Sequence, residues 1–501
     1  MDWGQRVTYL ASTALKERVT PFGIKDQDRT SHVCVMGKVG SGRAEILARM
    51  ALQDIERGVG VLVLDAGGNL GPMIMERLGK EAEARIAYLD AADAEYPFSW
   101  TSASEFRGFE EGKKIFRIVL PSVYSVPQTE LSDFVADYIL QSEGATILDL
   151  FHILGEEKRR AEMMPSESED GKKLTELMAA HTETVTKVTE GGRYLAKDTM
   201  VRNLLGQKES KLNLSDLHQG AIIILDLSRI RVFPTRVAPL LKLFSYAGQA
   251  VAAREGKPIG LFMHDCLRYL SEADAEYLFS DHSLAMTLSD TIYRESDQPL
   301  RERALTRCGS VLTFQPHQAD IELVQKSFYP YVSNEDLTQL EPGEACVALT
   351  IDGTRSNPFF ATALPLPDRL NISLQDIFVH SRQKYTTPRQ KVDQDFKRPD
   401  DDEDKKKGPG QFNDAFRNIF NKRQAAAAAT MSGGKPADPN QPPKEDTSAP
   451  PSPKAMEDKA EPVAAPAPAP AVPAQAEAKV EKREIPEADL RKLLYVGPIP
   501  A

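Results

Sequence analysis

Cysteine is scarce in this chain. Its 501 residues include four cysteines, Cys34, Cys266, Cys308 and Cys346, which lie far apart with no C-x-x-C spacing. A scaffold held by disulfides and a zinc site built on cysteine pairs are therefore excluded. We expect four reduced, buried thiols in a cytosolic protein.

Long apolar runs and an apolar leader are also missing. The N-terminus carries Asp2 and no apolar segment of the kind found in signal peptides. The longest apolar runs, such as residues 221–225, are far too short to span a bilayer. The sequence therefore predicts a cytoplasmic protein that reaches the inner face of a membrane only through a partner.

Positive charge is in deficit. The chain has 62 Lys and Arg against 73 Asp and Glu, a net charge of −11. This balance argues against a surface that is basic throughout, although one local basic channel remains compatible with it. A basic stripe with interleaved aromatic residues is missing too, so a general nucleic-acid-binding module is disfavoured.

What the chain does have is an alternation of short apolar runs and helical patterns. Residues 31–103 and 206–368 both show it, which predicts an α/β fold with one mainly parallel sheet. The expected strands are residues 33–36, 60–64, 86–89, 221–225, 259–263, 284–288, 311–314 and 345–351. The expected helices of the first half are residues 45–57 and 73–78. Residues 1–30 read as a polar, helical lead-in that ends at Pro21-Phe22-Gly23.

Two further segments differ in character. Residues 104–205 carry apolar side chains at helical spacing and no strand-like runs, which predicts an inserted all-helical subdomain. Residues 369–385 would close the folded domain. Residues 386–501 are rich in Pro and Ala and predict a disordered tail. Short apolar faces near residues 411–423 and 486–496 would become helical only on a partner, unless they are chance apolar residues in a linker.

The segment of residues 33–44 resembles a phosphate-binding loop. The pattern G-x-x-x-x-G-K-[ST] follows a buried strand and precedes a helix, and Gly37 and Gly42 stand at its spacing. The loop amides and the helix N-terminus would suit an anion, so ATP, with or without Mg²⁺, stays open as a ligand. The candidate nucleotide-binding residues are Gly37, Lys38, Gly40, Ser41, Gly42, Arg43 and Ala44. No residue is assigned as a metal ligand.

Two positions of the loop depart from the pattern. Arg43 stands where a lysine would reach the β- and γ-phosphates, and a guanidinium is a poor substitute for that compact ammonium. Ala44 stands where a hydroxyl would hold magnesium. Lys38 lies early in the loop and is not the catalytic lysine.

The order of these elements resembles the HerA–FtsK branch of P-loop ATPases, most closely the TraG/TraD-like coupling ATPases of conjugation and type IV secretion. The resemblance covers roughly residues 20–368 and rests on landmarks in a shared order. These landmarks are residues 61–70, 90–98, 201–203, 206–207, 222–228 and 358–360. The resemblance implies a RecA-like nucleotide domain with an all-helical insertion. It also implies hexameric rings that pump DNA or select protein substrates, using ATP bound between neighbouring subunits.

The same resemblance locates the remaining catalytic positions. Phe262-Met263-His264-Asp265-Cys266 aligns with a family strand that ends in D-E, so His264 replaces the metal-side Asp and Asp265 the catalytic Glu. A slip of one residue would make Asp265 the metal-side carboxylate, followed by Cys266. Either register breaks the acidic pair. We interpret Asp65 and Asp226, which also end strands, as loop caps, and His264 as a packed histidine.

The sensor and the arginine that reaches a neighbour's γ-phosphate are also replaced. Residues 289–291 lack the expected glutamine amide, and Gln315 stands where the arginine is expected. Arg301, Arg303 and Arg307 lie nearby in the sequence as possible substitutes.

These departures predict that hydrolysis is lost. Removing one group that stabilises charge in a transition state commonly costs a factor of about 100 to 1,000 in rate. Losses within one catalytic unit are not additive, but several together should leave little activity.

The sequence therefore predicts a pseudo-ATPase: a subunit or adaptor of a secretion or conjugation complex that completes a homo- or hetero-hexameric ring beside a catalytic paralogue, with DNA a candidate cargo of the ring. Two alternatives stay open. One is a slow DNA translocase that uses Arg43 and a displaced carboxylate; the other is a nucleotide sensor that does not hydrolyse.

Overall fold

The computed structural model describes residues 6–15, 18–257, 259–280, 283–291, 298–370 and 373–396. These residues belong to one compact unit. The short helices expected near residues 411–423 and 486–496 lie outside the described residues. Among the described residues, no helix is both long enough and apolar enough to cross a bilayer.

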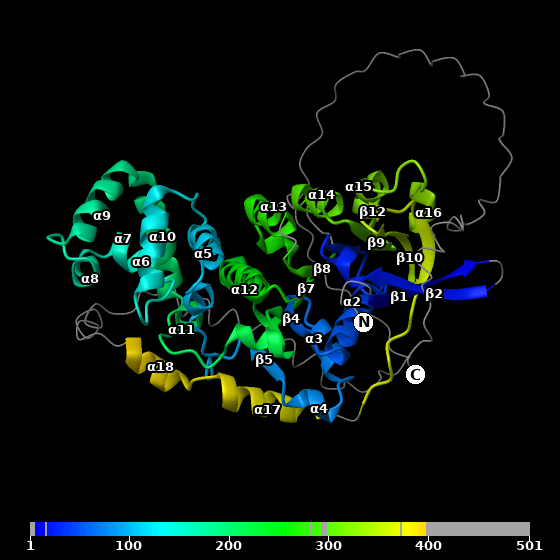
Figure 1. Ribbon diagram of the computed structural model, residues 1–501, viewed down its shortest axis with the longest axis horizontal. Coiled ribbons are helices and arrows are strands. Elements are labelled where there is room, and N and C mark those ends of the chain that lie inside the picture. Colours follow the sequence, from blue (N-terminus) through cyan, green and yellow to red (C-terminus); the bar gives the residue numbers. More distant parts are fainter. Residues whose placement is uncertain are drawn as a thin grey trace, which may run out of the picture. The chain divides into compact units, whose positions relative to one another are not determined.

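An eleven-stranded sheet organises this unit, in the order β2-β1-β13-β10-β9-β3-β8-β7-β4-β6-β5 (Figure 1). The strands from β9 to β5 in this order run parallel to one another. Those in the middle are buried on both faces, which explains their unbroken apolar runs. The predicted α/β fold with a mainly parallel sheet is confirmed.

The bounds of the strands are β1 Val7–Leu15, β2 Arg18–Lys25, β3 Val33–Met36, β4 Gly60–Asp65, β5 Ile86–Asp90, β6 Ile222–Asp226, β7 Ile259–His264, β8 Ala285–Asp290, β9 Ser310–Phe314, β10 Glu344–Ala348 and β13 Phe359–Ala363. The single strand expected at residues 345–351 is divided: β10 ends at Ala348, and Thr350–Ile351 form β11, which belongs to a separate two-stranded sheet. Strand β10 pairs antiparallel with β9 and β13, so this end of the sheet is not parallel.

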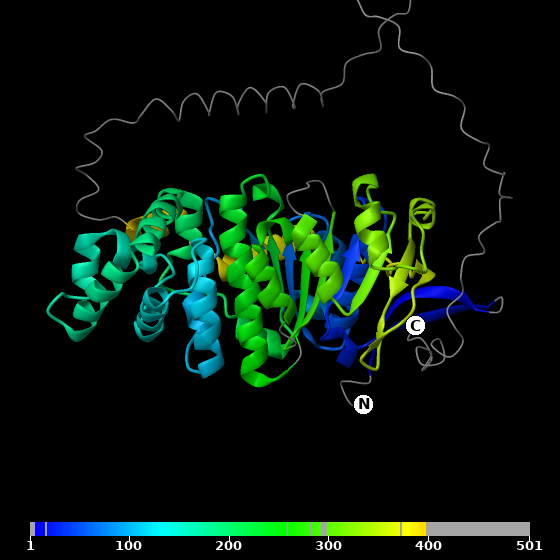
Figure 2. The same ribbon diagram turned by 90° about the horizontal axis from the view of Figure 1, so that it is seen from above.

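Helices cover both faces of the sheet (Figures 1 and 2). One face carries α2 Arg43–Glu56, α3 Leu70–Met75, α4 Lys80–Glu83 and α17 Leu374–Tyr385, whose apolar residues join one core. The other carries α12 Pro234–Glu255, α13 Glu272–Ser280, α14 Gln298–Arg307, α15 Ile321–Lys326 and α16 Asn334–Thr338 over a second core. The helix after β3 thus covers one face, and the helices after its neighbours β8 and β9 cover the other. Such a switch point opens a crevice at the carboxyl ends of the strands.

The N-terminal segment is not the helix that the sequence led us to expect. Strands β1 and β2 form an antiparallel hairpin, and β1 also pairs with β13. Strand β2 is at the edge of the sheet, where Pro21 is tolerated because one side of the strand needs no hydrogen bonds. Gly23 allows close approach to β1, since a Cβ there would lie 2.1 Å from the carbonyl oxygen of Thr8. Pro21-Phe22-Gly23 is therefore part of a strand, and of the described residues up to residue 30 only α1, Asp26–Arg29, is helical.

Residues 91–221, which the structure describes throughout, contain helices and no strand. The α-helices are α5 Glu110–Val123, α6 Glu130–Gln141, α7 Asp149–Gly155, α8 Glu157–Met163, α9 Glu169–Ala180, α10 Thr182–Lys197 and α11 Thr199–Leu205, and residues 102–106 and 214–219 form short 3-10 helices. The all-helical character expected for this insertion is present. Helix α5 packs on α12, and the apolar core of the insertion is continuous with that under α12. The domain boundaries near residues 104 and 205 remain predictions.

The folded part extends beyond residue 385. Residues 389–396, assigned to the tail from the sequence, form α18 Arg389–Phe396, which contacts α11. Val392 is fully buried there, and Asp393 pairs with Arg202 at 2.8 Å. The few apolar residues of α18 are buried against α11, which is far away in the sequence, so the sequence around α18 alone could not predict that this segment is folded.

Candidate functional site

The phosphate-binding loop lies between β3 and α2, as its pattern predicts. Gly40 and Gly42 have φ angles of 78° and 114°, a backbone conformation that side chains with a Cβ rarely adopt. A Cβ on Gly42 would lie 2.9 Å from the ring of Phe314, and one on Gly37 would lie 2.6 Å from Ser41 Oγ. The glycines therefore permit both the turn and its close packing against β9.

Neighbouring segments fix this loop. The Lys38 amide donates to the Gln315 carbonyl at 2.9 Å, and the Thr291 hydroxyl donates to the Gly37 carbonyl at 3.3 Å. The side chain of Gln315 donates to the Thr338 carbonyl at 2.7 Å. Gln315, which occupies the expected arginine position, therefore supports the loop of its own chain.

Arg43 points along the edge of the sheet toward β7. Its side chain is 4% exposed, and its Nη1 lies 2.7 Å from Oδ1 of Asp265. Nη2 donates to Oδ2 of Asp265 at 3.0 Å, and Nη1 donates to Ser289 Oγ at 3.3 Å. The residue at the lysine position and the residue at the acidic-pair position thus form a bidentate ion pair. Ala44, also buried, adds only a methyl group to the first turn of α2.

Asp265 directly follows β7 in a left-handed backbone conformation, with φ at 55°. Its amide donates to the Ser289 carbonyl at 2.9 Å, which holds this turn against β8. Burial alone would raise the pKa of the Asp265 carboxyl. The charge of Arg43 and its hydrogen bond, helped by His264 when the imidazole is protonated, more than offset burial, so this pKa lies below its usual value. The carboxylate is therefore ionised and committed to Arg43.

His264 is a packed histidine, as we interpreted it from the sequence. Its Nδ1 lies 2.6 Å from Ser289 Oγ, and its Nε2 lies 2.7 Å from Asn69 Oδ1. Burial, followed by repulsion from Arg43, lowers its pKa to about 4 despite the opposing charge of Asp265. The imidazole is therefore neutral near pH 7, and both of its nitrogens are used to join the loop after β4 to β8.

The other carboxylates that end strands act as loop caps, which agrees with the expectation. Asp65 accepts hydrogen bonds from the amides of Gly68 at 2.6 Å and Gly71 at 2.9 Å. Asp226 accepts from the Tyr88 hydroxyl at 2.6 Å and the Ser228 amide at 2.8 Å. Burial raises the pKa of Asp65 to about 6.

Three residues of this site were missed or given no role from the sequence: Asn69, Ser289 and Asp290. Asn69 and Ser289 bond His264 from two sides. Asp290 accepts the Leu267 amide at 2.9 Å, and burial, together with the charge of Asp265, raises its pKa to about 7. The available signal was the polar run at residues 289–291 at the end of an apolar strand.

The alternative register, with Cys266 as the second residue of the pair, gains no chemistry. The thiol of Cys266 is buried and donates to the Leu64 carbonyl at 3.2 Å. Burial also raises its pKa well above the usual value. A neutral thiol bonded to a backbone carbonyl cannot replace a carboxylate base.

The three arginines named as substitutes for a γ-phosphate contact are paired within the chain. Arg301 is buried and donates to Asp320 Oδ1 at 2.7 Å. Arg303 and Arg307 both pair with Glu276 of α13.

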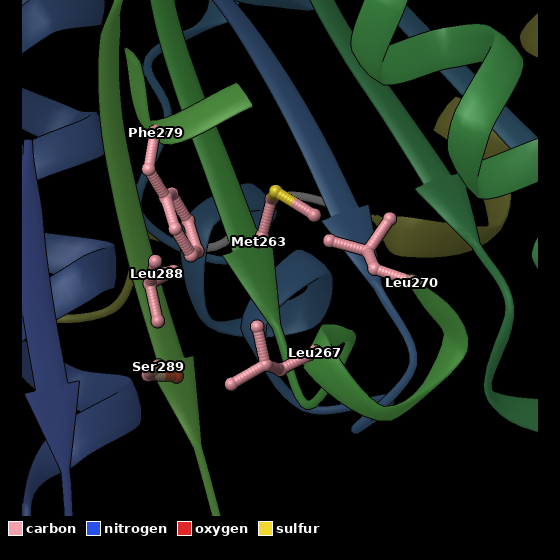
Figure 3. A pocket seen from close by; sticks show the side chains of 6 residues that line it. All are labelled: Met263, Leu267, Leu270, Phe279, Leu288 and Ser289. Carbon is pink, nitrogen blue, oxygen red and sulfur yellow. The ribbon is translucent and has the colours of Figure 1, made fainter. Parts of the chain in front are cut away.

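A small cavity lies beside Ser289. Figure 3 shows this cavity between β7, β8 and α13; its lining is apolar except for Ser289. Its volume is about 10 Å³, barely the space of one water. The residues that line it are Met263, Leu267, Leu270, Phe279, Leu288 and Ser289.

The side chains of the crevice do not fit a magnesium–triphosphate. Ala44 has no hydroxyl for the metal, and Arg43 is turned away onto Asp265. Within the described part of the chain, His, Cys, Asp and Glu side chains form no cluster of three that could hold a metal ion. The loop backbone still has the shape that suits an anion, but the side chains that would bind the metal and the terminal phosphates have been replaced.

Several solved structures are similar in fold. The bacterial conjugative coupling protein TrwBdeltaN70 is 13% identical, with 72% of this chain and 91% of that chain covered and a TM-score of 0.49. The plasmid coupling protein TrwB in complex with ADP and Mg²⁺ is 12% identical, with 70% and 89% covered and a TM-score of 0.48. VirB4 of Thermoanaerobacter pseudethanolicus is 11% identical, with 67% and 89% covered and a TM-score of 0.44.

Comparison with protein-family models and with curated protein sequences gave no match.

Proposed function

We propose that this chain is a catalytically inactive member of the coupling-ATPase group that its sequence resembles. The observation that carries the proposal is the ion pair between Arg43 and Asp265, with a closest contact of 2.7 Å. In a hydrolysing relative, the first position would contact phosphates and the second would act on metal or water. Here each side chain neutralises the other, so neither is available to ATP.

The proposed role is that of a subunit or adaptor in a type IV secretion or conjugation-like complex. The chain would complete a hexameric ring, with copies of itself or with a catalytic paralogue, and residues 397–501 would recruit partners. DNA is a candidate cargo of that ring, and contact with the inner face of a membrane would come through partners. The shared order of sequence landmarks supports this role, as does the retained sheet around a crevice whose reactive groups are replaced.

A hydrolysis assay tests the first part. ATP turnover by the purified full chain should not exceed that of its Arg43→Ala and Asp265→Ala variants, with or without DNA. Turnover that DNA stimulates and that both substitutions abolish would show a slow translocase instead.

Cross-linking in the native host tests the second part. We expect cross-links to a P-loop ATPase that has an intact G-K-[ST] and an intact D-E pair, or to further copies of this chain. Recovery of the chain only as an isolated monomer would overturn the role in a ring.

One observation favours a second candidate, a sensor that binds nucleotide without hydrolysing it. The loop keeps the backbone geometry of an anion site, and apart from its chain neighbours no described residue has an atom within 4 Å of where a Cβ on Gly40 would stand. Calorimetry with a non-hydrolysable ATP analogue separates this candidate from the inactive subunit. Saturable binding that a bulky substitution at Gly40 removes would support a sensor, and no binding would exclude it.

A further inference from the structure

A polar cavity of about 430 Å³ lies at the other end of β3 from the phosphate-binding loop. Ser31 lies two residues before β3 and Gly309 directly before β9, and both line the cavity. Because β3 and β9 are parallel, the cavity is at the amino ends of these strands, whereas the loop is at their carboxyl ends. It is therefore a separate site.

A small hairpin forms one wall of this cavity. Strands β11 Thr350–Ile351 and β12 Thr354–Arg355 are joined by Asp352 and Gly353, whose φ angles of 48° and 79° are both positive. An Asp-Gly pair with two positive φ angles is the signature of a type I′ turn. The hairpin therefore ends in a well-defined turn.

The turn is fixed to α1. The carboxylate of Asp28 is buried and accepts the amides of Asp352 and Gly353, each at 3.0 Å. Lys25 pairs with the Asp352 carboxylate at 2.5 Å. These contacts fix the backbone of the turn, and therefore the place at which Arg355 enters the lining.

Arg355, an exposed residue of β12, also lines the cavity. Among the residues that the structure describes, its side chain makes no hydrogen bond and no ion pair. The other charged groups of the lining are already committed, since Asp28 accepts two amides and Arg307 pairs with Glu276. The lining also offers hydroxyl groups from Thr30, Ser31, Thr306 and Thr350. The lining thus combines the Arg355 guanidinium with the Asp28 carboxylate, whose two oxygens are bonded to backbone amides, with the paired Arg307, and with neutral polar groups.

We propose that this cavity binds the oxyanion of a small organic molecule, a phosphate or a carboxylate, through Arg355. The planar guanidinium donates two parallel hydrogen bonds to such groups. The volume falls in the range of about 300 to 1,000 Å³ that is typical of small-molecule sites. The hydroxyl groups would contact the remainder of the molecule.

Calorimetry on the full chain tests this assignment, with inorganic phosphate, ribose 5-phosphate and citrate as probes at constant ionic strength. Arg355→Gln should weaken binding by at least about tenfold, the loss expected for a charge-assisted bidentate contact. Arg355→Lys should restore part of the affinity, because an ammonium keeps the charge without the fork.

The matched control is Arg369→Gln, which removes an exposed arginine that pairs with Glu76 and does not line the cavity. It should bind as the wild type does. Equal urea midpoints for all variants would show that they remain folded. Binding of the two phosphates alone assigns a phosphate ligand, and binding of citrate as well extends the assignment to carboxylates. Failure of the wild type to bind any of the three probes, or equal binding by Arg355→Gln, would overturn the proposal.

Discussion

Because Arg43 and Asp265 form an ion pair but differ in exposure, we predict that replacing one or the other lowers the free energy of unfolding by different amounts. The Arg43 side chain is 4% exposed and that of Asp265 23%. Asp265→Asn leaves a buried guanidinium without its counter-charge, which we expect to lower the free energy of unfolding by about 3 kcal/mol, the lower end of the range for a broken buried pair. Arg43→Met leaves a carboxylate that water can reach, so we expect a loss of about 1 to 2 kcal/mol.

The double variant completes a thermodynamic cycle. Because it leaves neither charge behind, it should cost about 2 kcal/mol less than the sum of the single changes. Urea unfolding followed by the fluorescence of the buried Trp100 measures all four proteins. Losses that add to within about 0.5 kcal/mol would refute the reasoning, since they would mean that the two side chains do not interact. A larger loss for Arg43→Met than for Asp265→Asn would refute the argument from exposure.

Further substitutions test the surrounding contacts. The ring of Phe396 lies 4.9 Å from the Arg202 guanidinium, so Phe396→Ala should speed hydrogen exchange of α18 by about tenfold, and the exposed Gln394→Ala should not. The pKa of His264 in the folded chain is about 4. As the pH falls from 6.5 to 4, the imidazole of the unfolded chain takes up a proton more readily than that of the folded chain, so the wild type should lose about 3 kcal/mol of stability. Urea unfolding of His264→Gln, measured at each pH, should lack this dependence. For Asp290 the dependence of stability on pH runs the other way. Its pKa in the folded chain is raised to about 7, so the stability that comes from its bound proton is lost as the pH rises through 7. Asp290→Asn should therefore gain stability relative to the wild type between pH 5 and pH 8, and a constant difference in stability between the two proteins would contradict the raised pKa.

The sequence predicted the parts of the fold whose signals are local. Strands β3, β4, β6 and β7 are continuous apolar runs because both faces of a parallel sheet are covered, and each was expected within a residue or two of its place. The hairpin of β1 and β2 was missed because its stability comes from pairing with β13, more than 300 residues later in the chain. Helix α18 was missed for the same reason, since its buried residues meet α11 only in the folded chain.

In the candidate site, too, the sequence predicted the features that have a local signal and missed those that depend on contacts between distant segments. Spacing alone placed Arg43 and Ala44 in the loop, and alignment with a family placed Asp265 at the end of a strand. Neither could show that the side chains of Arg43 and Asp265 touch, because their contact spans more than 200 residues and depends on the parallel register of β3, β8 and β7.

That contact changes how the replaced positions relate to one another. In the sequence alone, Arg43 and Asp265 are two independent replacements of catalytic residues, and a single substitution could reverse either one. In the folded chain they are one buried pair, supported by Ser289 and His264. A lysine restored at position 43 would lack the fork that contacts both oxygens of Asp265, and would still have no hydroxyl beside it at Ala44. Recovery of hydrolysis would therefore require coordinated change at both ends of the pair, which is why we interpret the crevice as a structural joint between β3, β7 and β8.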